Sequence, residues 1–418
     1  MLRNRTLLAV SLAVFVAYTG IGMVGPVRVL YAQSQGASLA IIGAMASAYL
    51  VSNFLFQYPV GWLADRWGRK QVLVVGFLVQ AMLALAYLFI VDPLQFVFLR
   101  LLEGVAAAGV LPAARALIVD EVPPEKRGEA YGIFGAAFNA GFLLGPGLGG
   151  LLATTGYASA FIGAVVFRLF AIVITLTLIK VKQPLPTATA KHGAAIPYRQ
   201  LFTLPLVGAY LLAFGDYLYL GFDQTVMPLW MHDHLGASVA VIGFAYMMWA
   251  IPSMILSPFG GRVADRRRRS WLILIGGLAQ VPLYIVYGLT SAIFLIVALF
   301  AVQSCFYAFV QPAVDSHVAT ASDVDVRARV QGMYSTIGLI GAFVGANVFS
   351  PLYGLNYRLP LFTLGIAYGL FILVGGSMIR FAESHGLIYG AGEIAKDNSE
   401  QYTELVDAMR EEQQTEML

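Results

Sequence analysis

Three carboxylates and one arginine stand out in this sequence because long apolar runs surround them. Arg100 and Glu103 lie in LRLLEGVAAA (99–108), and Asp216 and Asp223 lie in a later apolar stretch. An ionisable side chain inside a bilayer costs at least about 2.5 to 3.5 kcal/mol on insertion scales, so each of the four is a candidate for function. A spacing of three residues places Arg100 and Glu103 on one face of a helix, where they can form an ion pair.

The chemistry available to such groups is reversible protonation. Burial favours the neutral form of a carboxyl group and a nearby arginine favours its charged form, so movement of an arginine relative to an acid can drive proton uptake and release. We rank Asp223 first as the proton-coupling residue, then Asp216, then Glu103 with its neighbour Arg100. For each acid, the alternative is a static ion pair that fixes the packing of helices.

The elements that hold these residues are predicted to be membrane-spanning helices. Apolar residues make up 59% of the 418 positions and charged residues 12%, whereas soluble domains have roughly 45–50% and about 25%. About 20 helical residues cross a hydrocarbon core of roughly 30 Å, and a helix satisfies its own backbone polar groups in lipid. Twelve apolar stretches have such lengths: 6–31, 39–62, 71–91, 94–119, 128–154, 158–180, 204–231, 238–261, 271–290, 292–319, 328–353 and 359–381.

The positions of lysine and arginine predict the orientation of the chain. If Arg3 and Arg5 are cytoplasmic, most of the basic residues lie on the same side, and Arg358 is the one base in a predicted outer loop. Cytoplasmic loops carry the excess of basic residues, so both termini are expected inside the cell. The first span lacks a signal-peptide cleavage pattern and is expected to be retained. The single cysteine, Cys305, excludes an intramolecular disulfide.

The sequence repeats itself at a shift of 200 residues. GWLADRWGRK (61–70) returns as GRVADRRRRS (261–270), and GASLAIIG (36–43) returns as GASVAVIG (236–243). Two copies of a six-helix unit share one orientation and are related by an axis along the membrane normal. The chain is therefore predicted to comprise a first half (1–181), a cytoplasmic linker (182–203), a second half (204–382) and an acidic cytoplasmic tail (383–418).

The repeated loop resembles the signature of a known transporter family. The pattern G-x-x-x-D-R-x-G-R-K is typical of the major facilitator superfamily, and here it comprises Gly61, Asp65, Arg66, Gly68, Arg69 and Lys70, with a degenerate copy that keeps Asp265. The resemblance covers all twelve spans and implies two pseudo-symmetric bundles of six transmembrane helices. It also implies that Asp65 lies against the helix that begins near Arg327 and that Arg69 pairs with Asp120, in contacts that separate on inward opening.

Two further patterns narrow the resemblance. Arg100 and Gly104 match the family's R-x-x-Q-G motif, with Glu103 where glutamine is usual. GFLLGPGLGG (141–150) matches the G-x-x-x-G-P-x-x-G-G motif typical of proton-driven antiporters, and the alternative is a packing face of small residues. The family's antiporters often carry an acid in the first helix, and this sequence has none from Thr6 to Tyr31. The residues of the antiporter motif are Gly141, Gly145, Pro146, Gly149 and Gly150.

The repeat also pairs two opposite charges. Arg115 and Asp315 occupy equivalent positions, each near the cytoplasmic end of its span. In the family's architecture these ends meet when the cavity opens outward, so an ion pair between them would form an inner gate that breaks on inward opening. The alternative is that each residue pairs within its own half.

The substrate site is expected between the halves, near the middle of the membrane. Aromatic side chains suit bulky apolar or amphipathic molecules, although any one of them can instead pack between helices or face lipid. The acids favour a cationic or neutral amphiphile, whereas Arg28 and Arg168 could equally receive an anion or a lipid headgroup. The candidate cavity residues are Arg28, Arg168, Tyr18, Asn53, Gln57, Asn139, Tyr217, Tyr246, Trp249 and Tyr307.

The leading hypothesis is a proton-coupled antiporter of the cell membrane, resembling the twelve-helix drug:proton group, that exports amphipathic molecules by alternating access. The alternatives are a lipid or lysolipid transporter of the same fold, a solute importer, or a non-transporting membrane sensor or scaffold. No P-loop, zinc-ligand spacing or nucleophile elbow occurs, so neither an enzyme, a cofactor nor a metal is expected. The expected partners are protons, the substrate and the bilayer, with no nucleic acid, and a monomer is expected.

Overall fold

The computed structural model describes residues 4–123, 127–179, 201–266, 268–322 and 326–387. Within these ranges all regular structure is helical, and twelve segments are long and apolar enough to span a membrane. The predicted all-helical fold with twelve spans is therefore confirmed. The helices are α1 (Arg5–Ser34), α2 (Leu39–Trp67), α3 (Arg69–Ala86), α4 (Leu94–Ala108), α5 (Val110–Glu121), α6 (Arg127–Leu152), α7 (Tyr157–Leu178), α8 (Leu204–Asp223), α9 (Val226–Asp233), α10 (Val239–Arg266), α11 (Arg269–Leu278), α12 (Val281–Leu289), α13 (Ile293–Thr320), α14 (Arg327–Leu355) and α15 (Leu359–Ser384), with 3₁₀ turns η1 (Tyr87–Phe89) and η3 (Ala153–Thr155).

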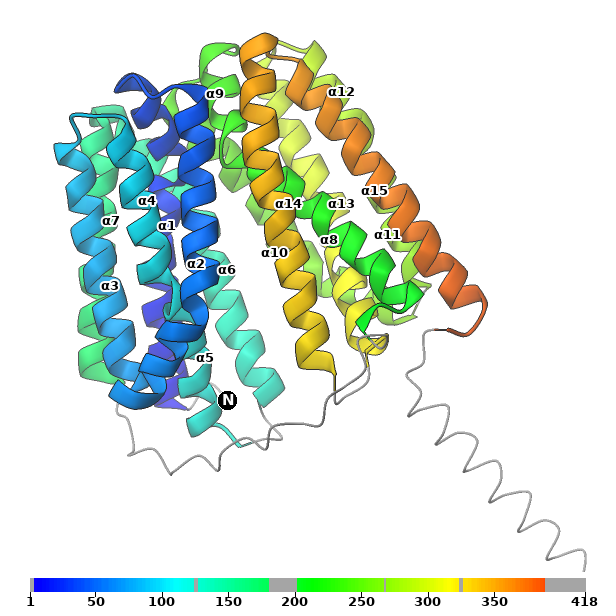
Figure 1. Ribbon diagram of the computed structural model, residues 1–418, viewed down its shortest axis with the longest axis horizontal. Coiled ribbons are helices and arrows are strands. Elements are labelled where there is room, and N and C mark those ends of the chain that lie inside the picture. Colours follow the sequence, from blue (N-terminus) through cyan, green and yellow to red (C-terminus); the bar gives the residue numbers. More distant parts are fainter. Residues whose placement is uncertain (1–3, 124–126, 180–200, 267, 323–325, 388–418) are drawn as a thin grey trace, which may run out of the picture.

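The helices form two bundles that lie side by side, with α1 to α7 in the first and α8 to α15 in the second (Figure 1). In the first bundle α1 packs against α6 and α7, and in the second α8 packs against α14 and α15. The bundles meet where α2 packs against α14 and where α6 packs against α10. We refer to the two ends of the molecule by residues of α1, as the Arg5 end, where the helix begins, and the Gln33 end, one residue before the helix finishes.

Three of the predicted spans are interrupted, four or five residues before a proline. α4 ends at Ala108, four before Pro112; α8 ends at Asp223, five before Pro228; and α11 ends at Leu278, four before Pro282. Proline has no N–H to donate to the carbonyl four residues earlier, and its ring collides with that carbonyl. The predicted continuous span at 204–231 is therefore wrong at this point, because it divides into α8 and α9.

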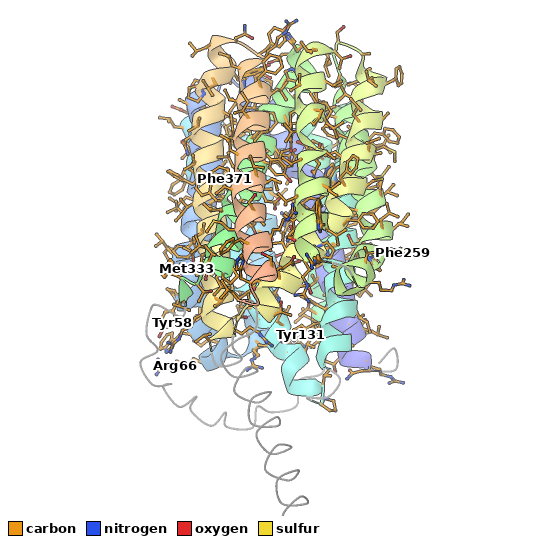
Figure 2. The ribbon with its side chains drawn as sticks, turned by 90° about the vertical axis from the view of Figure 1, so that its right-hand side faces the viewer. Tyr58, Arg66, Tyr131, Phe259, Met333 and Phe371 are labelled. Atoms are coloured by element: carbon orange, nitrogen blue, oxygen red, sulfur yellow. The ribbon has the colours of Figure 1, made fainter. Side chains whose placement is uncertain are left out.

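Aromatic residues mark the Arg5 end of α2. The side chains of Tyr58, Trp62 and Trp67 are exposed at this end of the helix. The guanidinium of Arg66 lies 4.9 Å from the ring centroid of Trp62, and Figure 2 shows Arg66 and Tyr58 near the same end of the molecule. Exposed tyrosine and tryptophan rings beside a basic residue are typical of a helix end at the membrane–water interface.

Candidate substrate cavity

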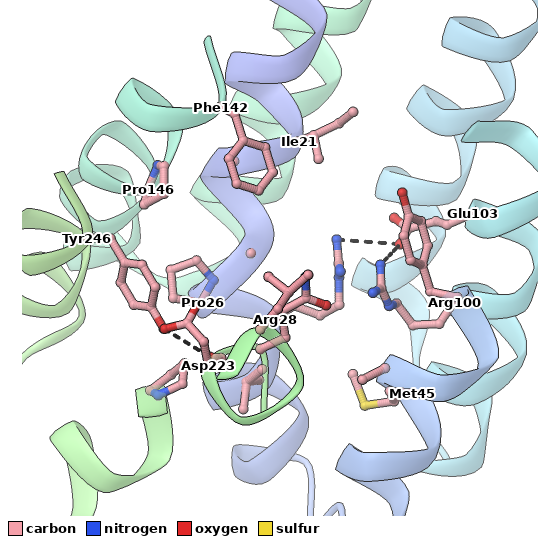
Figure 3. A pocket seen from close by; sticks show the side chains of 18 of the residues that line it. Ile21, Pro26, Arg28, Met45, Arg100, Glu103, Phe142, Pro146, Asp223 and Tyr246 are labelled. Atoms are coloured by element: carbon pink, nitrogen blue, oxygen red, sulfur yellow. Dashed lines mark hydrogen bonds and ion pairs between the residues drawn. The ribbon is translucent and has the colours of Figure 1, made fainter. Parts of the chain in front are cut away.

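A cavity of about 190 Å³ lies between the two bundles. Its walls are mostly apolar and include Ile21, Met45, Phe142, Pro146 and Leu220. Charged and polar side chains gather at two places on these walls, as Figure 3 shows for the labelled residues: Arg28, Arg100 and Glu103 on one side, and Asp223 and Tyr246 on the other. The polar lining residues are Arg28, Tyr49, Gln80, Arg100, Glu103, Arg168, Asp223, Gln224 and Tyr246.

Glu103 is the centre of the first polar group. Its Oε2 atom lies 3.0 Å from Nη1 of Arg100 and 3.4 Å from Nη2 of Arg28, and accepts a hydrogen bond of 3.3 Å from the Tyr87 hydroxyl. All four residues are less than 9% exposed. The structure brings together Arg100 and Glu103 as the sequence predicted, because three residues separate them on α4. Arg28 and Tyr87 come from α1 and η1, and this meeting was not predicted.

Arg168 extends this group from α7. Its Nε donates to Oε1 of Gln80 at 3.5 Å, and its Nη1 donates to the carbonyl of Ala164 at 3.2 Å. Within the described part of the chain no carboxylate lies within 4.0 Å of its guanidinium, so Arg168 is buried without a counter-ion. Gln80 is a cavity residue that the sequence interpretation missed.

Asp223 faces the first group from the other bundle. It is the last residue of α8, and the Tyr219 hydroxyl donates to its Oδ1 at 3.5 Å. The Tyr246 hydroxyl donates to its backbone carbonyl at 3.0 Å. Among the described residues no lysine or arginine forms an ion pair with Asp223. At the end of α8 the cavity wall therefore carries a carboxylate that has no counter-ion among the described residues.

Asp216 and Asp315 lie outside this cavity. They are electrostatic neighbours of each other and of Tyr307, and Asp315 accepts a hydrogen bond of 3.0 Å from Gln311. Arg115 and Asp315 make no ion pair within the resolved ranges given above. The inner gate therefore stays a prediction, for a conformation that differs from this one.

The remaining cavity candidates are scattered. Tyr246 lines the cavity as predicted, as do Arg28 and Arg168. The others do not line it. The aromatic ones among them pack inside the bundles: Tyr18 is buried against Phe138, with ring centroids 4.6 Å apart, Trp249 and Tyr307 pack with ring centroids 5.2 Å apart, and Tyr217 packs over Gly338. Asn53 donates a hydrogen bond to the Gly104 carbonyl and accepts one from Gln57, and Asn139 is exposed.

The antiporter motif on α6 is a close-packing surface. A Cβ atom at Gly141, Gly145 or Gly149 would overlap the backbone of α1, and one at Gly150 would overlap the Val239 carbonyl on α10. Pro146 lines the cavity itself. Small residues let helix backbones approach closely. The motif therefore sets the distance of α6 from α1 in its own bundle and from α10 in the other bundle, next to the cavity.

The signature loop joins α2 to α3 through Gly68, whose φ of 104° favours glycine. Arg69 donates a hydrogen bond to the Ala116 carbonyl at 2.7 Å. Lys70 donates to the carbonyls of Leu176 and Ile179 at 2.9 and 2.7 Å, so its positive charge lies at the carbonyl end of α7. Gly61 has open space around it, Arg66 is exposed, and Arg327 donates to the Ser322 carbonyl at 3.5 Å. The predicted partners Asp65, Asp120 and Asp265 have side chains outside the described residues, so their contacts stay predictions.

This sequence and fold are similar to those of known membrane transporters. The sequence model of the Major Facilitator Superfamily matches residues 10–346 and 217–386. Multidrug resistance protein 2 of Bacillus subtilis (strain 168) is 24% identical over 84% of this chain and 90% of its own, and the quinolone resistance protein NorA of Staphylococcus aureus is 22% identical over 89% and 96%.

Among solved structures, a bacterial homolog of the human lysosomal transporter Spinster, in an inward-facing and occupied conformation, matches with a TM-score of 0.72. It is 16% identical, and the match covers 93% of this chain and 99% of that one. The twelve spans and these matches indicate a multi-pass transporter of the cell membrane and not an enzyme. The chain belongs to the Major Facilitator Superfamily.

Proposed function

We propose that the protein exports amphipathic small molecules in exchange for protons. The observation that carries this proposal is the carboxylate of Asp223, which forms no ion pair with a described residue, on the wall of a largely apolar cavity between the bundles. A carboxylate without a fixed counter-ion can take up a proton and release it as its surroundings change. An apolar cavity with few polar groups suits an amphipathic molecule. The relatives whose names concern multidrug and quinolone resistance support the same substrate class.

The contacts between the bundles support alternating access. Gln33 Nε2 donates to Oδ2 of Asp233 at 2.8 Å, and Asn347 of α14 donates to the Ser47 hydroxyl of α2. These interbundle hydrogen bonds join described residues on the Gln33 side of the molecule. If both termini are in the cytoplasm, as the sequence predicts, the Gln33 end faces the outside of the cell, and this conformation is closed on that side. Rocking of the bundles would then break these bonds and close the Arg5 end.

The test is proton movement in liposomes that contain the purified protein and an internal pH-sensitive dye. Addition of cationic, neutral and anionic amphiphiles to the wild type should cause compound-dependent proton flux in at least one class. Asp223→Asn should abolish that flux, because an amide cannot carry the proton. Asp92→Asn is the matched control, since Asp92 is exposed in the turn before α4 and its cap on the Leu94 N–H survives the change.

Two results would contradict the proposal. Flux that persists in Asp223→Asn would remove this carboxylate from the coupling step, and Asp216→Asn would then be the next variant. Movement of labelled lipid without proton flux for any compound would favour a lipid transporter of the same fold.

A further inference from the structure

The cavity wall carries more positive charge than negative charge. Three arginines line it, Arg28, Arg100 and Arg168, against two acids, Glu103 and Asp223. Arg28 and Arg100 both approach the same oxygen of Glu103. Glu103 carries a single negative charge and so cannot neutralise all three arginines, and Asp223 forms no ion pair with any of them among the described residues.

The same wall carries buried donors that lack acceptors. Nε of Arg28 and Nε2 of Gln80 have no hydrogen-bond partner among the described residues, although Arg28 is 7% exposed and Gln80 is 3% exposed. Arg168 is 2% exposed and has no counter-ion in the described ranges. Buried polar groups normally have hydrogen-bond partners, because a buried donor without one gives up its hydrogen bonds to water and gains none in the protein. A group with several acceptor oxygens and a negative charge would satisfy all three residues.

The second bundle shows that this fold does not need the arginines. At a shift of 200 residues, Arg28 corresponds to Pro228, Arg100 to Phe300 and Arg168 to Tyr368. The tyrosine contact itself is kept, since Tyr287 donates to Oε1 of Gln303 at 2.8 Å where Tyr87 donates to Glu103. Uncharged side chains therefore occupy the equivalent positions of the second bundle, so helix packing alone does not explain why the first bundle has arginines there.

We propose that the cavity binds amphiphiles with an anionic head group, a carboxylate or a phosphate, held by Arg28, Arg168 and Gln80. Guanidinium groups recognise carboxylates and phosphates through paired hydrogen bonds. The apolar part of the molecule would lie against Met45, Phe142 and Pro146. This inference rests on the proposed function, because it names the substrate class of the same cavity. Of the two alternatives that the sequence left open, it favours an anion at Arg28 and Arg168 over the cationic or neutral amphiphile that the acids suggest.

The experiment measures equilibrium binding to the full-length protein in detergent, without a proton gradient. The probes are 11-(dansylamino)undecanoic acid at a pH where it is ionised and its uncharged methyl ester, followed by dansyl fluorescence. The wild type should bind the acid about ten-fold more tightly than the ester, or more, as charge-assisted hydrogen bonds predict. Arg168→Gln should remove that preference and leave ester binding unchanged, whereas Arg168→Lys should keep part of it.

Arg262→Gln is the matched control. Arg262 is an exposed arginine of α10 that donates to the Pro258 carbonyl and lies outside the cavity, so its loss should leave both affinities unchanged. Competition by dodecanoate and by a lysophosphatidate of the same chain length distinguishes a free carboxylate from a lipid head group. Equal binding of acid and ester by the wild type would overturn the inference, and so would an acid preference that survives both Arg168→Gln and Arg28→Gln.

The outcome does not depend on whether the variants fold. On the wild type alone, the acid should raise the Tm and the ester at the same concentration should raise it less, because a ligand that binds only the folded state stabilises it more when it binds more tightly. Equal shifts would overturn the inference. Selective binding of the acid without proton flux would refute the proposed antiport alone. Proton flux with cationic compounds and no preference for the acid would refute the inference alone.

Discussion

Glu103→Gln tests whether one carboxylate holds the charged group of the first bundle together. The substitution keeps the shape of the side chain and removes the charge that faces Arg100 at 3.0 Å and Arg28 at 3.4 Å. Both arginines are less than 9% exposed, so hydration compensates little for the lost partner. Removal of one member of a buried ion pair costs about 3–5 kcal/mol, and we expect a loss in that range.

The assay is thermal unfolding of the purified protein in detergent, followed by tryptophan fluorescence. Glu103→Gln should lower the Tm by several degrees, and Arg100→Gln should lower it as well. The double variant should be more stable than the sum of the two losses predicts, with a coupling toward the upper part of the range of about 0.5–3 kcal/mol that neighbouring residues show. Asp92→Asn should leave the Tm unchanged. Additive losses, or a Tm for Glu103→Gln equal to that of the wild type, would refute the reasoning.

Two further predictions concern helix packing and pH. Gly149→Val should abolish transport, because its side chain would overlap the backbone of Met23, whereas Gly132→Ala on the same helix meets open space and should retain activity in the liposome assay. His234 lies beyond α9 and outside the spans, and although it is exposed, desolvation of its ring, which packs on Tyr357, and the charge of Arg358 lower its pKa against the opposing effect of Asp233. The unfolded chain therefore binds this proton more readily, and stability should fall as the pH drops through about 6.5, the ordinary value for histidine. His234→Gln should reduce that fall in the Tm, and an unchanged pH profile would count against it.

The sequence was sufficient for features that depend on local pattern. The twelve spans follow from runs of apolar residues, and the pairing of Arg100 with Glu103 follows from a spacing of three on a helix. The other arginine that contacts Glu103, Arg28, lies 75 residues earlier in the chain. Nothing local brings Arg28 to Glu103, because their meeting depends on how α1 packs near α4. The interruption at Gln224 was missed although Pro228 signals it, since other prolines such as Pro312 lie inside unbroken helices.

A closer comparison of the two halves would have identified more of the site. The repeat pairs Tyr87 with Tyr287, Glu103 with Gln303 and Gln80 with Gln280, all buried in the structure. A tyrosine and a Glu or Gln side-chain oxygen that recur at equivalent positions indicate a shared structural contact, and the observed hydrogen bonds of Tyr87 and Tyr287 are that contact. What differs between the halves is then informative, because it is not required by the shared fold.

The two bundles differ in the net charge that they place on the cavity wall, which is positive in the first and negative in the second. The first bundle places three arginines and one glutamate around the cavity, and the second contributes Asp223, while Asp216 and Asp315, which neighbour each other, lie outside it. Charges buried in a membrane protein are expensive, so a scaffold that folds with phenylalanine, proline and tyrosine at the equivalent positions has no structural need for them. A proton carrier and an anion site on opposite bundles would both change their surroundings whenever the bundles rock. The opposite arrangement, with acid and arginines in one bundle, would move as a rigid body and would leave each group's neighbours unchanged.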